Sequence, residues 1–332
     1  MSDDFIHFAF TLGDGSAPLH GSDSIAAALQ EETCAWVHLQ ADDPRSDDWI
    51  DAHLDYLPEA VRDALIADAT RPRTSAVGDG VLLNVRGVNL NEGEDPEDMI
   101  SVRIWADPAR IVTLTRRPLR SVEHMRDLFA AGEGPATAGR FLAVLVEELT
   151  ERIGSVVTEM DVDADALEDR LLRGEENGLG PRITDSRAAV VDFRRFLVPQ
   201  REAIARLHGV TGPLLSEDDR FELQEAEDNL RRHTEVIESL RERLLVLKDE
   251  IASLSDARLN RNLYILSVVS AVFLPLGFLT GLMGINLAGM PGASWPPAFW
   301  VFTGALGALT LVLLALLWRW GVIRLRRAST RP

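Results

Sequence analysis

The sequence predicts a mixed α/β domain that continues into a long helical stalk and ends in two transmembrane helices. Three observations lead to this fold class. The first part alternates short apolar runs with turn residues, a pattern typical of strands and short helices. From Gly139 onwards the pattern becomes helical. Finally, residues 262–318 contain no Asp, Glu, Lys, Arg or His, although 26% of the chain is charged.

The first part is expected to form a sheet with flanking helices. Two helices are predicted, at 46–55 and at 58–69, where Pro58 stands in the first turn. The acidic segment NEGEDPED is predicted to be a loop, a hairpin connection between two strands, and its charge indicates either a solvated turn or a metal site. The expected strands are FIHFAFTL (5–12), CAWVHLQ (34–40), VLLNVRGVNL (81–90), MISVRIWA (99–106) and RIVTLTR (110–116).

Two breaks divide the helical part that follows. GEENGLGP (174–181) and GVTGP (209–213) are Gly/Pro-rich, so two helices should form an antiparallel pair before a third begins. Ser216 is the expected N-cap of that third helix, with Asp218 and Asp219 in its first turn. No Gly or Pro then occurs before Pro275, which predicts one long stalk helix.

A heptad runs along this helix. Its apolar seam is predicted to pack on the preceding helices, and His233 on the seam is interpreted as an interhelical polar residue rather than a metal ligand. The seam consists of Leu223, Ala226, Leu230, His233, Ile237, Leu240, Leu244, Leu247, Ile251 and Leu254.

An acidic stripe repeats every seven residues on the opposite face. It indicates either solvated surface or, if several copies face one axis, a negative funnel below a pore. The stripe is Asp228, Glu235, Glu242, Asp249 and Asp256. Steps of three and four continue this face as a line of mostly small or polar residues, which suits a pore wall or a close helix contact: Asn260, Leu263, Ser267, Ser270, Leu274, Gly277, Gly281 and Gly284.

The uncharged stretch is long enough for two membrane spans of roughly 20 residues each. They are predicted at 263–284 and 298–318. Arginines precede the first span and follow the second, whereas the loop that connects the spans has none. Because Lys and Arg near membrane ends stay on the cytoplasmic side, both termini are expected in the cytoplasm. The acidic N-terminus does not fit a signal peptide. The flanking arginines are Arg258, Arg261, Arg319, Arg324, Arg326, Arg327 and Arg331, and the expected interfacial anchors are Trp295, Trp300, Trp318 and Trp320.

The net charge of the chain limits which ligands it can bind. Six Arg of the 34 basic residues lie in 261–332, so residues 1–260 hold 28 basic against 52 acidic side chains, a balance of −24. Cations suit such a surface, whereas nucleic acid does not. Cys34 is the single cysteine, which excludes an internal disulfide. No phosphate loop, zinc-protease motif or nucleophile motif occurs, so neither an enzyme nor a cofactor is expected.

The first span ends in LTGLMGIN (279–286), and Gly284-Ile285-Asn286 resembles the Gly-Met-Asn triplet of the CorA family of divalent-metal transporters. Isoleucine in the middle, with Gly289, Met290, Pro291 and Gly292 in the loop, is closer to the zinc-transporting ZntB branch. The stretch from Arg71 to Trp105 is similar to that branch too. The resemblance implies a funnel-shaped homopentamer in the bacterial inner membrane, with the first span lining the pore and a ring of Asn286 at its outer mouth.

The segment between 262 and 318 offers an ion no carboxylate, histidine or cysteine. A dication should therefore pass at least partly hydrated, held by the Asn286 amide, by carbonyls of Gly281 and Gly284 and by hydroxyls. The converging helix ends would add negative charge at the mouth. Leu263 and Leu274 are candidate constrictions, or ordinary packing residues.

Zinc is the expected cation, with a magnesium, cobalt or nickel channel and a non-conducting metal-sensing scaffold as alternatives. Direction of transport and proton coupling stay open. The expected divisions are an α/β domain (1–135), a helical pair (136–215), the stalk (216–262), the first span (263–286), an external loop (287–297), the second span (298–318) and a basic tail (319–332).

Overall fold

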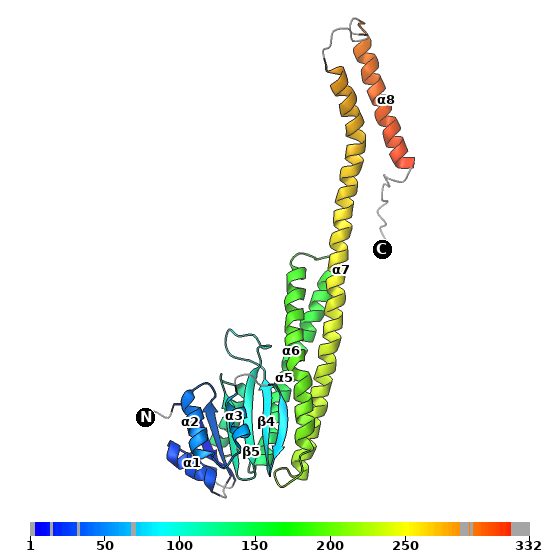
Figure 1. Ribbon diagram of the computed structural model, residues 1–332. Helices are drawn as coiled ribbons and strands as arrows, with labels where there is room; N and C mark the ends of the chain where they lie inside the picture. Colours follow the sequence, from blue (N-terminus) through cyan, green and yellow to red (C-terminus); the bar gives the residue numbers. More distant parts are fainter. Residues whose placement is uncertain are drawn as a thin grey trace. The chain divides into compact units, whose positions relative to one another are not determined.

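The computed structural model describes residues 4–13, 16–31, 34–67, 71–285, 292 and 295–319. The chain divides into two compact units, Met1–Asp249 and Glu250–Pro332. The first unit holds a sheet and most of the helices, and the second holds the two apolar helical segments (Figure 1). Each unit is described by itself below.

The first unit is built on a six-stranded mixed sheet. Its spatial order is β1 (Ile6–Thr11), β2 (Ala35–Gln40), β6 (Arg110–Thr115), β5 (Ile100–Asp107), β4 (Gly80–Gly87) and β3 (Arg73–Val77). Neighbouring strands are antiparallel except β2 and β6, which run parallel with Val37 opposite Val112. The five predicted strands are confirmed, and so is the mixed sheet.

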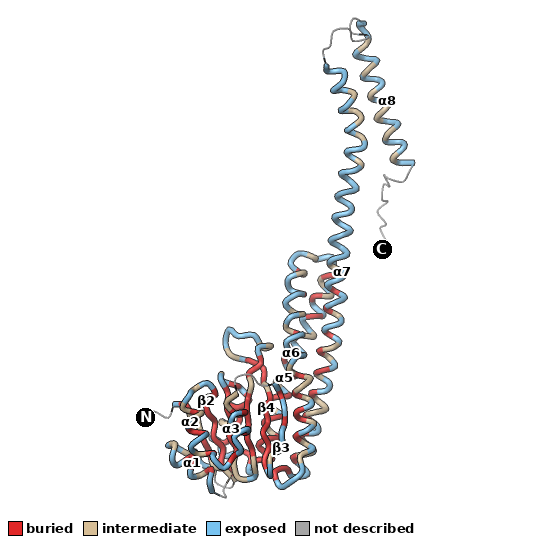
Figure 2. The backbone as a smooth tube through the Cα atoms, in the orientation of Figure 1, coloured by how far each residue is buried: buried red, intermediate tan, exposed pale blue. Residues whose placement is uncertain are grey.

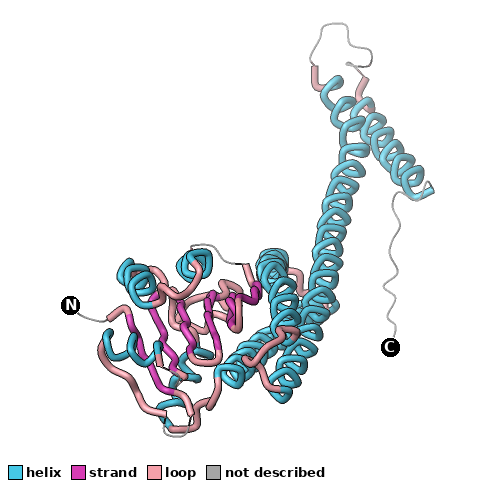
Figure 3. Tube along the Cα trace, turned by 60° about the horizontal axis from the view of Figure 1, so that its bottom comes forward, coloured by secondary structure: helices cyan, strands magenta, loops and turns pink. Residues whose placement is uncertain are grey.

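Helices cover both faces of the sheet (Figure 3). One face packs on α1 (Ser22–Gln30), α2 (Pro44–His53) and α3 (Glu59–Ile66), where Leu29, Ile50 and Leu65 are buried. On the other face, Trp36 of β2 packs on Phe141 of α5 (Ala138–Leu172) with ring centroids 4.8 Å apart, beside α4 (Arg120–Ala131). Because the central strands are buried on both faces, they read as nearly continuous apolar runs.

Three elements escaped the sequence prediction for physical reasons. Strand β3 buries only Thr74, so it shows no apolar alternation. The N-cap residues of α1 and α4 are Gly21 and Leu119, and neither makes a side-chain capping hydrogen bond, so the usual start signal is missing. By contrast, Asp43 caps α2 by accepting a hydrogen bond from the Arg45 backbone N–H at 2.9 Å, which starts this helix two residues earlier than predicted.

The helical pair and the stalk follow the prediction. Helix α5 runs antiparallel to α6 (Leu179–His208), and α7 extends over Glu217–Met283 (Figure 1). At its start the Ser216 hydroxyl accepts a hydrogen bond from the Asp219 N–H at 3.1 Å, and Asp219 Oδ2 accepts one from the Ser216 N–H at 2.9 Å. This reciprocal pair is a capping box, so the predicted cap is confirmed.

The heptad seam of α7 is buried against α5 and α6 as far as Leu247 (Figure 2). Beyond it, Ile251 is half-buried and Leu254 is 36% exposed, so the seam ends earlier than the repeat suggested. His233 lies against Gly154 of α5, where an added Cβ would stand 2.6 Å from its Nε2 atom. Burial, followed by the charge of Arg232, lowers the pKa of His233.

A side chain completes the sheet where β3 ends. Strand β3 pairs with β4 only as far as Asn84, opposite Arg73. Two residues further along β4, the buried Gln200 amide of α6 accepts a hydrogen bond from the Arg86 N–H at 2.7 Å and donates one to the Arg86 carbonyl at 2.9 Å. The amide thus takes the place of a neighbouring strand.

The second unit contains the end of α7 and helix α8 (Ala298–Arg319). Both helices are long and apolar enough to cross a membrane by length and composition. Among the residues described in this unit, none is buried within the chain (Figure 2). Leu274 is 74% and Trp300 73% exposed, so this apolar surface needs lipid or another copy to cover it.

The buried His38 predicts acid sensitivity of the first unit. Its Nδ1 atom lies 2.9 Å from Thr113 Oγ1, its Nε2 atom lies 3.2 Å from Thr115 Oγ1, and burial lowers the pKa of His38 to about 3. Because the folded pKa lies below the unfolded value of about 6.5, stability is fully present above pH 6.5 and is lost as pH falls towards 3, by about 1.4 kcal/mol per pH unit.

Replacing this histidine by glutamine keeps the hydrogen-bonding character but removes the titration. We expect H38Q to show a shallower loss of thermal stability between pH 6.5 and 4 than the wild type, measured by tryptophan fluorescence of the full chain in detergent. The exposed His124→Gln serves as the control and should follow the wild type. Identical pH profiles for H38Q and wild type would contradict the assignment.

Candidate ion pathway

The predicted pore-wall residues fall on one face of α7 in the second unit. Steps of three and four residues keep a line on the same side of a helix, since the helix repeats every 3.6 residues. Every member is exposed in the single chain, and a Cβ added at Gly277 or Gly281 would meet nothing within 4 Å. This face is therefore open to water, lipid or another copy, and it comprises Asn260, Leu263, Ser267, Ser270, Leu274, Gly277 and Gly281.

Two hydroxyls on or near this line, those of Ser267 and Thr280, are turned onto the helix backbone. Ser267 donates to the Leu263 carbonyl at 2.8 Å, and Thr280 donates to the Leu276 carbonyl at 2.9 Å. This back-bonding satisfies the donor in an apolar setting and leaves the oxygen lone pairs available to a cation or its water shell. Thr280, one residue before Gly281, was not among the predicted pathway residues because it lies off the three-and-four line.

Helix α7 ends close to the predicted position. Its last helical residue is Met283, and the Gly284 N–H donates to the carbonyls of Thr280 at 3.0 Å and Gly281 at 3.1 Å. Ile285 is 47% exposed, and Gly292 has a φ of 87°, a conformation that favours glycine. Other predicted positions lie outside the described residues: Asn286, Gly289, Met290, Pro291, Trp320, Arg324, Arg326, Arg327 and Arg331.

The acidic stripe keeps its place on α7, away from the buried seam. Asp228 forms an ion pair with Arg231 at 3.2 Å. The other members, Glu235, Glu242, Asp249 and Asp256, are exposed. In a single chain this is a solvated face.

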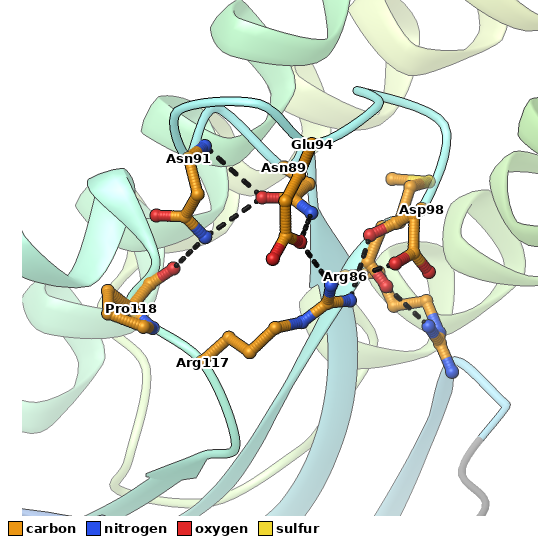
Figure 4. Close-up of polar contacts among 8 residues, drawn as sticks. Arg86, Asn89, Asn91, Glu94, Asp98, Arg117 and Pro118 are labelled. Atoms are coloured by element: carbon orange, nitrogen blue, oxygen red, sulfur yellow. Dashed lines mark hydrogen bonds and ion pairs between the residues drawn. The ribbon is translucent and has the colours of Figure 1, made fainter.

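The acidic loop 91–98 is held by an arginine (Figure 4). Arg117, just beyond β6, donates to Glu94 and to Asp98, the latter at 2.8 Å, while Asn89 donates to Glu94. Asn91 donates to the Pro118 carbonyl at 3.1 Å. The carboxylates of Glu94 and Asp98 are thus neutralised by a guanidinium, and the loop is the β4–β5 hairpin connection that was predicted.

Among the residues that the structure describes, no group of three or more His, Cys, Asp or Glu side chains is placed to hold a metal ion. Burial raises the pKa of the Cys34 thiol to about 12, which disfavours the thiolate that binds metals. Along the uncharged part of α7, from 262 to 283, the available chemistry is accordingly that of amide, carbonyl and hydroxyl oxygens.

Comparisons with known proteins place the chain in a family. The family described as CorA-like Mg2+ transporter protein matches residues 31–320. Zinc transport protein ZntB of Pectobacterium atrosepticum is 33% identical over 86% of this chain and 85% of its own length. Divalent cation transporter CmaX of Pseudomonas aeruginosa is 34% identical over 87% of this chain and 88% of its own length.

Solved structures agree with this placement. The structure of full-length CmaX covers 94% of this chain and 97% of its own, with a TM-score of 0.79 and 32% identity. The CorA magnesium transporter of Methanocaldococcus jannaschii covers 95% and 98%, with a TM-score of 0.76 and 17% identity, a likeness of fold. The chain belongs to the CorA family, a family of membrane transporters for divalent cations.

The contacts of Arg117 predict that this residue keeps the β4–β5 loop ordered and protects it from proteolysis. Arg117→Gln removes two ion pairs, which at a partly exposed site contribute about 1 kcal/mol each at most. We expect cleavage of the full chain at Glu92 or Glu94 by a glutamate-specific protease to become roughly five- to twentyfold faster. Arg126→Gln, which removes an exposed pair with the adjacent Asp127, is the matched control. Equal cleavage rates for both variants would contradict the role of Arg117.

Proposed function

We propose that this protein carries divalent metal cations, Zn2+ in the first place, across the bacterial inner membrane through a pore built by several copies of the chain. Family membership supports the class of activity. The observation that carries the pore is the uncharged stretch 262–318, which provides two spans only. Two helices cannot enclose a water path, so identical copies must ring an axis.

The first span is our choice for the wall of that pore. The line from Leu263 to Gly281 forms one face of mostly small and polar residues, and no residue that the structure describes covers it. Helix α8 offers no comparable polar line, since it is apolar nearly all round. Five copies, the number that the family resemblance implies, would bring five helix ends and five Asn286 side chains to one mouth.

Without carboxylates in the membrane, selectivity would rest on the hydrated ion. The Asn286 amide and the carbonyls near Gly281 and Gly284 would hydrogen-bond or replace part of the water shell. The acidic stripe from Asp228 to Asp256 would raise the local cation concentration on the cytoplasmic side, where the positive-inside distribution puts both termini. The domain divisions drawn from the sequence fit this arrangement.

Zinc is favoured over magnesium by the Gly284-Ile285-Asn286 triplet and by the relatives named for zinc transport. Magnesium remains the second candidate because the family description names Mg2+, and cobalt and nickel belong with it. The name of CmaX specifies no more than a divalent cation. A non-conducting metal-sensing scaffold is the remaining alternative.

Flux measurements separate the cations. With the purified protein in liposomes, we expect Zn2+ uptake to exceed that of Mg2+, Co2+ and Ni2+ at equal concentration. A series with and without a pH gradient tests proton coupling, and acceleration of Zn2+ uptake by an inward proton gradient would support it. Strong Mg2+ uptake with no Zn2+ uptake would reject the zinc assignment.

A substitution at the proposed pore mouth distinguishes a protein that conducts cations from a non-conducting scaffold. Asn286→Ala should lower Zn2+ flux about tenfold or more, the effect of losing roughly 1.4 kcal/mol of ion stabilisation, while the assembly measured by native mass spectrometry is unchanged. Thr303→Ala, which trims a polar side chain from α8, should retain flux. A scaffold would show no flux in the wild type and no response to either change.

A further inference from the structure

A pocket of about 210 Å3 lies in the first unit where the β4–β5 loop meets three helices. Its apolar walls come from four elements: Pro96 of the loop, Val156 and Met160 of α5, Val190 of α6 and Leu244 of α7. Val190 and Leu244 are each 1% exposed, so the base of the pocket is part of the helical core. An apolar base of this kind favours a ligand with a hydrocarbon body.

Three carboxylates also line this pocket, and no basic side chain does. They are Glu97 of the loop and Glu159 and Asp163 of α5. Over the part of the chain that the structure describes, none of the three takes part in an ion pair or a side-chain hydrogen bond. The pocket therefore combines an apolar base with an uncompensated negative rim.

Five neighbouring carboxylates are paired with arginines. Arg243 of α7 forms ion pairs with Asp161 at 2.9 Å, with Asp165, and with Glu168 at 3.2 Å, all on α5. In the loop, Arg117 neutralises Glu94 and Asp98 in the same way (Figure 4). The chain thus supplies an internal cation to the acidic groups on either side of the pocket, and it supplies none to the pocket itself.

The chemistry of the walls distinguishes two kinds of cation. A bare divalent metal needs several oxygen ligands converging on one point, and the carbon-lined base offers none. The three carboxylates are also not grouped closely enough to hold one ion together. Separate positive charges joined by an apolar chain match both features, because each ammonium would reach a carboxylate while the methylene groups cover the half-buried Pro96 and Met160.

We propose that this pocket binds a linear alkyl polyamine, with its methylene chain on the apolar base and its ammonium groups at Glu97, Glu159 and Asp163. The site is separate from the ion pathway along α7. A bound polyamine would join the β4–β5 loop to all three helices that line the pocket.

The proposal is tested by calorimetric titration of the full chain with 1,4-diaminobutane in nanodiscs of neutral lipid at fixed ionic strength. Each lost carboxylate should weaken binding about three- to fivefold, so Glu159→Gln with Asp163→Asn should weaken it about tenfold or more. The matched control is Glu151→Gln with Asp169→Asn, which removes two exposed charges from the same helix outside the pocket and should bind as the wild type does.

Two further measurements examine the apolar half of the site. Affinity should rise roughly fourfold from 1,3-diaminopropane to 1,4-diaminobutane, because one more methylene is buried. Ala189→Phe, which fills the pocket from α6, should abolish binding and leave the melting temperature of the free protein within a few degrees. Equal weakening in the two double variants, unchanged binding in Ala189→Phe, or equal affinity for the two diamines would overturn the proposal.

Discussion

The two apolar helices of the second unit impose the constraint on which the rest of the molecule depends. None of their described side chains is buried, and in water a large area of hydrocarbon would be solvated. A bilayer removes the free-energy cost of exposing this hydrocarbon to water. A helix is stable in the bilayer because its backbone polar groups are hydrogen-bonded within the helix. The charged side chains are accordingly absent from 262–318, and most of the small and polar residues that α7 carries in this stretch lie on one face.

The sequence predicted elements well where local and tertiary signals agree. Helix α7 has a capping box, a regular heptad and no breaker over its first 58 residues up to Leu274, so its start and its buried face followed from the pattern. Helix α4 lacks a side-chain cap and is stabilised by packing of Met125 and Phe129, which a local pattern does not reveal. Strand β3 depends on its neighbour β4 for pairing and buries a single side chain.

For the candidate site, position was easier to predict than chemistry. The fixed period of a helix places Ser267, Gly277 and Gly281 on one face whatever surrounds them. The identity of the cation could not be predicted from such a face. Amide and carbonyl oxygens that act on a water shell would distinguish cations by how the copies of the chain are arranged and not by the type of ligand. Contacts between distant segments could not be predicted from the sequence either. The ion pairs of Arg117 with Glu94 and Asp98, for example, join residues about twenty positions apart.

The pairing of Gln200 with Arg86 has a consequence for how copies of the chain can meet. An open strand edge is a template on which a foreign strand can add, and the short β3 leaves the end of β4 without a strand on the side away from β5. The Gln200 amide occupies both hydrogen-bonding groups of Arg86 there, so a visiting strand would have to break two buried bonds before forming its own. Self-association by sheet extension is thereby opposed at this position.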